Sequence, residues 1–275
     1  MKNLLGLCLV LTAVCSAQET TPRTGNANIV TRMSPEEISA RIRERLEAQG
    51  IALEDVIRAA REEHGKTRSA GKTVMAHAVR QSALSGKDQT NLDRIVNVFN
   101  RTYKIYSTLG LLNSAPDLYY NTDPTINAYA SQGKQVVIYL ALAELLQDSD
   151  SELSFAVAHE LGHIVQQRTN TLYFVYDNPE FDADVWGVLA SLLAGYEPYA
   201  GSGTLSKLSM ATGDVGLAQQ YEDQSAADAH KSFVTRIEVM YDALRAVCGV
   251  SADFQATCNQ YRSTMHPHFP AGAVL

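Results

Sequence analysis

Hydrophobic residues recur at helical spacing in two segments after residue 33. The first pattern begins at Ser34, a helix-capping residue followed by proline, and ends at Gly50. Its narrow apolar stripe consists of Ile38, Ile42 and Leu46. A second, similarly charged helix is predicted over about residues 53–63, and the small, weakly patterned residues of 64–88 predict a linker.

The pattern changes after residue 90. The stretch TNLDRIVNVFNRTYKIYSTLGLL predicts a long helix, because its apolar residues lie three or four positions apart. Beyond the turn at Pro116 follow three short stretches rich in Tyr, Val and Ile, namely DLYYNTD, INAYAS and KQVVIYLAL. They predict short extended segments, with a hairpin at Gly133 between the last two.

The stretch SFAVAHELGHIVQQ is apolar on nearly every side and predicts a buried helix, which begins at Ser149 with Glu152 completing a capping box. His159 and His163 are four residues apart, so their imidazoles lie one turn apart on one face and can converge on a tetrahedral metal ion. Glu160 can then accept a proton from a metal-held water and pass it to a leaving amine. The alternative, an ordinary buried helix, would leave three polar groups without stated partners, which is costly.

A catalytic zinc site needs a third protein ligand, and the next helix supplies a candidate. The stretch DNPEFDADVWGVLASLLAGYEP begins with Asn178 as cap and Pro179 at the first position, which places Glu180 in the first turn. Asp184 follows one turn later, where it can accept a hydrogen bond from a ligand histidine and fix its tautomer. Complementation of the helix dipole is the alternative role of Glu180, but it does not explain the acidic cluster that follows.

HELGH with a downstream ExxxD resembles the pattern of the glutamate-type zincins. INAYASQGKQVVIYLALAELLQDSDSELSFAVAHELGHIVQQ and EFDADVWGVLASLLAGYEP are similar to the prenyl-protein and heat-shock endopeptidase family of metallopeptidases, especially its soluble, exported members. The resemblance covers roughly residues 90–245. It implies one Zn²⁺ per chain, held by His159, His163 and Glu180, with Glu160 as general base and acid.

The resemblance has three further implications. It implies that the strand around Val136–Tyr139 is a sheet edge that pairs with extended substrate. The family usually carries a His-Pro pair near the zinc with an arginine six residues after the histidine, and here DAHKSFVTRIEVM supplies His230 and Arg236 but has lysine in place of the proline. These two are candidate catalytic residues for oxyanion stabilisation, or else a surface pair on an amphipathic helix. The connection between the two site helices is shorter than in many relatives, so the wall of the cleft is expected to differ.

The expected fold is α+β and mostly helical. A zincin-like metalloprotease domain with a small mixed sheet and an HExxH core helix occupies 89–275, preceded by a polar leader and N-terminal helical segment over 18–88. Residues 1–17 have the charged, apolar, small-residue order of a secretory signal peptide, so we expect an exported chain, periplasmic or secreted. A bacterial lipoprotein anchored through Cys15 is a variant of this interpretation, and a buried N-terminal helix is the alternative to a signal peptide. No later stretch is long and apolar enough to span a membrane.

The remaining composition bears on stability and partners. Cys248 and Cys258 are the cysteines outside the signal segment, and an even pair in an exported protein predicts a disulfide. The net charge is −7 and no basic block occurs, so nucleic acid is not an expected partner.

The sequence thus predicts a zinc-dependent endopeptidase whose substrates are unfolded or misassembled envelope polypeptides. The alternative is a non-proteolytic, zinc-bearing chaperone or scaffold that binds clients through its edge strand. A further hypothesis places His266 or His268, in the C-terminal tail, at the open position of the zinc.

Overall fold

The computed structural model describes residues 32–66, 84–169, 175–212 and 233–249, together with five residues between 252 and 259. Its helices are α1 Pro35–Glu47, α2 Leu53–Lys66, α3 Gly86–Thr108, α4 Leu140–Leu145, α5 Asp150–Thr169, α6 Pro179–Leu193, α7 Ala200–Thr212 and α9 Phe233–Cys248. Its strands are β1 Asp117–Asn121, β2 Ala128–Ser131 and β3 Gln135–Tyr139. The predicted signal peptide, His230, His266 and His268 lie outside the described residues.

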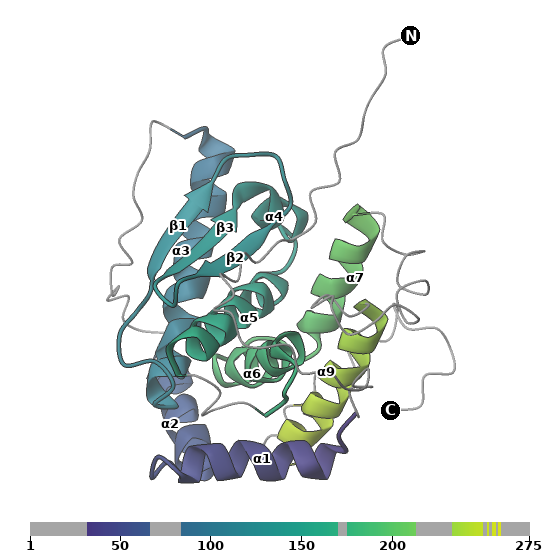
Figure 1. The fold of residues 1–275 in the computed structure, drawn as a ribbon. Coiled ribbons are helices and arrows are strands. Elements are labelled where there is room, and N and C mark those ends of the chain that lie inside the picture. The colour runs from purple at the N-terminus through teal and green to yellow at the C-terminus, as the bar shows by residue number, and fades with distance from the viewer. Residues whose placement is uncertain are drawn as a thin grey trace, which may run out of the picture.

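The described residues confirm the α+β, mostly helical fold with a small mixed sheet (Figure 1). The sheet packs beside α5, α6 lies on the other side of α5, and α9 packs against α6. Among these helices, none is both long and apolar enough to cross a lipid bilayer.

The N-terminal helices share the main hydrophobic core. Ser34 caps α1 in a full capping box, because its hydroxyl accepts from the Glu37 amide while the Glu37 carboxylate accepts from the Ser34 amide. The predicted stripe of α1 is completely buried and belongs to the same cluster of side chains as the residues of α5. Helix α1 runs along the base of the molecule in contact with α9, and α2 contacts α6 (Figure 1). The boundary at residue 88 between two units stays a prediction.

The sheet differs from expectation in strand order. Its order is β1-β3-β2, with β3 parallel to β1 and antiparallel to β2. The implication that the strand around Val136–Tyr139 forms the edge is therefore wrong: β3 is the central strand, and β2 is the outer strand that also packs against α5. The hairpin at Gly133 is confirmed, since Gln132 and Gly133 both have positive φ, 53° and 63°, in the turn that joins β2 to β3.

One predicted element boundary and one predicted capping contact also need correction. The third extended stretch, KQVVIYLAL, is a strand only up to Tyr139, because the leucine- and alanine-rich residues that follow form α4. Ser149 caps α5 as expected by accepting from the Glu152 amide at 3.2 Å. The Glu152 carboxylate does not complete a capping box, because it pairs with Lys207 of α7 at 2.7 Å.

Helices α5 and α6 approach each other closely at the glycine of HELGH. A Cβ atom on Gly162 would lie 3.0 Å from the Ala183 Cα and 3.2 Å from the Ala183 Cβ. A Cβ atom on Gly187 of α6 would lie 3.4 Å from the His159 backbone nitrogen, which is an ordinary contact distance. These small residues let α5 and α6 lie close together, so that His159, His163 and Glu180 can meet between them.

The predicted disulfide is present between Cys248 at the end of α9 and Cys258, with a Cα–Cα distance of 6.1 Å. It ties the residues after α9 back onto this helix, and both cysteines are buried.

Candidate metal centre

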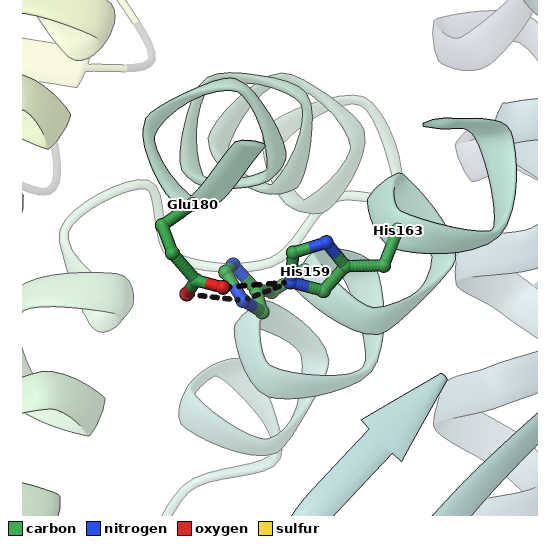
Figure 2. Close-up of side chains that lie close together, drawn as sticks. All are labelled: His159, His163 and Glu180. Carbon is green, nitrogen blue, oxygen red and sulfur yellow. Dashed lines mark hydrogen bonds and ion pairs between the residues drawn. The ribbon is translucent and has the colours of Figure 1, made fainter. Parts of the chain in front are cut away.

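Three side chains from two helices converge on one point between α5 and α6. Figure 2 shows His159 and His163 on α5 directed toward the carboxylate of Glu180 from the first turn of α6. The two Nε2 atoms are 3.0 Å apart, and they lie 3.5 Å (His159) and 3.3 Å (His163) from the Glu180 oxygens. Two imidazole nitrogens and a carboxylate oxygen are the ligand set of a catalytic zinc site, so this group can hold a metal ion.

Asn178 sets the position of Glu180 in this arrangement. Its side-chain oxygen accepts from the amides of Glu180 and Phe181 at 3.0 and 3.1 Å, so the predicted cap of α6 is confirmed. Because the helix begins there, Glu180 projects from the first turn, where the positive end of the helix dipole favours a carboxylate.

Each histidine has a separate partner on its other ring nitrogen. The Nδ1 atom of His159 lies 2.9 Å from a carboxylate oxygen of Asp184, and that of His163 lies 2.8 Å from the side-chain oxygen of Gln166. Both partners are acceptors, so each Nδ1 carries the proton and each Nε2 directs a lone pair at the convergence point. Three electron-pair donors facing one another need a cation between them, and this is the observation that fits the residues to a metal.

The charges of the site favour a cation at the same point. In the absence of a metal ion, burial and Arg236 lower the pKa of His159, but the carboxylates of Asp184 and Glu180 outweigh them and raise it to about 9. Burial raises the pKa of Glu180, whereas Arg236 and the two histidines hold it well below its usual range. At neutral pH His159 therefore carries a positive charge when no metal ion is bound, which shows that the site favours a cation.

Arg236, from α9, completes a buried network of charges. It binds Asp184 in a bidentate manner, with its Nε and Nη2 atoms 2.9 and 2.7 Å from the two carboxylate oxygens, and its Nη1 lies 3.2 Å from Glu180. The Asp184 side chain is 0% exposed and that of Arg236 11%. Arg236 thus lies within the site, and its assignment with His230 to oxyanion stabilisation stays a prediction.

Glu160 lies next to His159 on α5 and is buried. Burial raises the pKa of its carboxyl above the usual range, although the neighbouring histidines oppose this. The raised pKa lies closer to neutral pH, and a general base works best when its pKa is near the pH of the reaction.

The sequence pattern does not identify Gln166 or Asp182 as parts of the site. Gln166 lies three residues after His163, and residues three apart on a helix are neighbours, so this spacing was the available signal. Asp182 belongs to the acidic cluster of Glu180, Asp182 and Asp184, but the sequence does not indicate which residue it would contact. Gly162, likewise, is a small residue whose close contact with the next helix could not be read from one sequence.

Of the comparisons with known proteins, the match to a family model agrees with this geometry. A search among curated proteins found no match. The sequence model of peptidase family M48 matches residues 104–267, which include both site helices and α9. Since this match covers more than half of the chain, and the donor set is that of a metal-dependent peptidase, the resemblance found in the sequence is confirmed: the chain belongs to peptidase family M48 and is a metallopeptidase.

Proposed function

We propose that the protein is a zinc-dependent endopeptidase that cleaves unfolded polypeptides. The observation that carries the proposal is the convergence of two Nε2 lone pairs and the Glu180 carboxylate between α5 and α6. A bound zinc ion would polarise the scissile carbonyl and lower the pKa of a water molecule. Two histidines and a glutamate leave a fourth position open for that chemistry.

Glu160 is proposed as the general base and acid. Its carboxylate takes a proton from the attacking water and delivers it to the nitrogen of the departing amine, so one residue serves both halves of the hydrolysis. Its burial in the same apolar helix excludes bulk water that would otherwise compete for this proton.

The substrate is proposed to bind along β2, the outer strand next to α5. The Tyr139 amide donates to the Asn127 carbonyl at 3.0 Å, so in this antiparallel pair alternate residues of β2 bond to β3. The intervening residues, Ala128 and Ala130, direct their N–H and C=O groups away from β3. An extended peptide can pair with these groups as an added strand, a mode that requires an unfolded segment and little side-chain specificity.

We further propose export of the chain after cleavage behind Ala17, which would make envelope polypeptides its substrates. The apolar run of residues 4–14 and the small residues that follow support this proposal. Mass spectrometry of the protein recovered from the envelope fraction tests it: a mature chain beginning at Gln18 is expected, and an intact N-terminus in the cytoplasm contradicts it.

The activity is tested by cleavage of a reduced, alkylated model protein. Wild type is expected to cleave it, a chelator to stop cleavage, and zinc to restore it. Glu160→Gln removes the base but keeps the shape of the side chain, so kcat should fall about 10²- to 10⁴-fold. Glu62→Gln, on the exposed face of α2, is the matched control and should leave cleavage unchanged.

Two outcomes contradict the proposal. Cleavage that persists in Glu160→Gln assigns the base elsewhere, and cleavage that survives complete removal of metal excludes a metal-dependent mechanism. Binding of the unfolded protein with no cleavage by zinc-loaded wild type would favour the chaperone alternative.

A further inference from the structure

The partner of His163 is neutral and comes from its own helix. The Gln166 side-chain oxygen lies 2.8 Å from the Nδ1 atom of His163, one turn further along α5. Gln166 is half-buried, and its amide could in principle present either its oxygen or its nitrogen to the imidazole. Which group faces His163 decides the tautomer, since an amide nitrogen there would place the ring proton on Nε2 and block the metal.

Two acceptors on the other side of the amide decide this orientation. The Gln166 nitrogen donates to the Pro179 carbonyl at 2.7 Å and to the Asp182 carboxylate at 2.9 Å. An inverted amide would direct its oxygen at both of these acceptors and its nitrogen at His163. The first turn of α6 therefore holds the Gln166 oxygen toward the histidine.

Asp182 is itself held in place by the loop that precedes α6. Its other oxygen accepts from the amides of Val175 and Tyr176 at 2.6 and 3.3 Å, and its side chain is buried. This loop is in turn held by α1 and by Met33, two residues before α1. Arg41 donates to the Val175 carbonyl at 2.8 Å, and the Met33 amide donates to the Tyr176 hydroxyl at 3.3 Å.

We propose that Gln166 is a positioning residue for the metal site, oriented by Asp182, which fixes His163 in the tautomer and ring direction that metal binding requires. This inference rests on the proposed zinc site and assigns a role to residues that touch neither the metal nor the substrate. It also gives the N-terminal helix α1 a part in the site, because α1 holds the loop that holds Asp182.

The test measures metal affinity rather than activity. Zn²⁺ dissociation constants are obtained by competition with a chromogenic chelator for wild type, Gln166→Met and Asp182→Asn. Methionine matches glutamine in length but makes no hydrogen bond to the imidazole, so affinity should fall about 10- to 100-fold, the usual cost of losing such a partner. Asp182→Asn places an amide donor where Gln166 now finds an acceptor, so it should weaken zinc binding in the same direction by a smaller factor.

Gln167→Met is the matched control. Gln167 is the neighbouring glutamine of α5, but its oxygen accepts from the Gly133 amide in the β2–β3 turn, away from the histidines. Its substitution should leave zinc affinity within about twofold of wild type. The visible spectrum of the Co²⁺-loaded protein provides a second readout: it should change in Gln166→Met, because the His163 ring is released, and stay unchanged in Gln167→Met.

The possible outcomes distinguish a failure of the proposed zinc site from a failure of the positioning role of Gln166. If wild type binds no zinc, the proposed metal site fails. If wild type binds zinc while Gln166→Met and Asp182→Asn retain its affinity and its Co²⁺ spectrum, the site stands and the positioning role of Gln166 is wrong. If Gln166→Met is too unstable to purify, the affinity and spectrum of Asp182→Asn decide alone.

Discussion

The two histidines of one motif are supported in opposite ways. His159 is held by Asp184 and Arg236, a buried, bidentate ion pair contributed by α6 and α9. His163 is held by the amide of Gln166, which is neutral, half-buried and one turn away on the same helix. The motif spacing places both rings, but their orientation depends on different parts of the chain.

This difference separates two properties of the site. The support of His159 is also a structural element, because three helices meet at a buried charge pair, and breaking such a pair leaves an uncompensated charge. The support of His163 lies near solvent, so its loss should affect the metal more than the fold. We therefore expect substitutions on the His159 side to lower stability and metal affinity together, and those on the His163 side to lower mainly affinity.

The largest expected effect is that of Asp184→Asn on the stability of the metal-depleted protein. Removing one charge of a buried pair costs about 3 kcal/mol or more, so the free energy of unfolding in urea should fall by this amount. Asp55→Asn is the control, because Asp55 pairs with Arg58 at an exposed position of α2, where such pairs contribute about 1 kcal/mol or less. Equal losses in the two variants would show that the buried pair of Asp184 and Arg236 contributes no more to stability than an exposed pair.

The double variant Asp184→Asn, Arg236→Met sharpens this result. It removes both charges, so it should be more stable than Asp184→Asn alone. A double variant that loses the sum of the two single losses would show that the pair is not coupled.

The next effect concerns pH. Because the pKa of His159 is raised to about 9, this group is protonated at neutral pH, and a metal ion must displace the proton. Burial lowers the pKa of His163, but the Glu180 carboxylate outweighs this and raises it as well. Apparent Zn²⁺ affinity should therefore rise about tenfold or more per unit between pH 6 and pH 8, with at least one proton released per zinc. Calorimetry in buffers of different ionisation enthalpy measures this release, and a value near zero would contradict the charged state of His159.

Gly162→Ala should disturb the supports of both His159 and His163, because it pushes α5 and α6 apart. Alanine usually stabilises a helix by up to about 1 kcal/mol relative to glycine, but here its Cβ would lie 3.0 Å from the Ala183 Cα. Overpacking of this kind costs about 1–3 kcal/mol, so the net change should be a loss of stability. At Gly86, the first residue of α3, no atom lies within 4 Å of an added Cβ, and Gly86→Ala should cause no loss. A stabilised Gly162→Ala would show that the helices can separate freely.

The smallest expected effect is that of Gln166→Met on the unfolding of metal-depleted protein. The hydrogen bonds of Gln166 are partly open to water. The free energy of unfolding should therefore fall by less than about 1 kcal/mol, in contrast to the larger fall in Asp184→Asn. A loss as large as that of Asp184→Asn would mean that the two supports do not differ in kind.

The sequence predicted the His159 side more completely than the His163 side, for a physical reason. Asp184 lies one turn after Glu180 on a helix whose cap and first residue are readable, so its proximity to the metal ligands follows from helix geometry. The orientation of Gln166 depends on Asp182 and on a loop held by α1, and these contacts arise only when segments distant in sequence pack together.

The sheet illustrates the same limit. Alternating Tyr, Val and Ile residues predicted three extended stretches, but strand order depends on how the chain crosses over between β1 and β3, which no local pattern records. The sequence pattern predicts a continued strand where α4 forms, because a short apolar run does not distinguish a strand from a buried helix.

The central claim is that His159, His163 and Glu180 together bind one zinc ion, and X-ray absorption at the zinc edge of the zinc-loaded protein tests it most directly. We predict one zinc per chain, nitrogen and oxygen neighbours at about 2.0–2.1 Å, and the multiple scattering of two imidazoles. In Glu180→Gln the first coordination shell should change while both imidazoles remain. Sulfur neighbours at about 2.3 Å, fewer than two imidazoles in wild type, or no bound zinc would contradict the account.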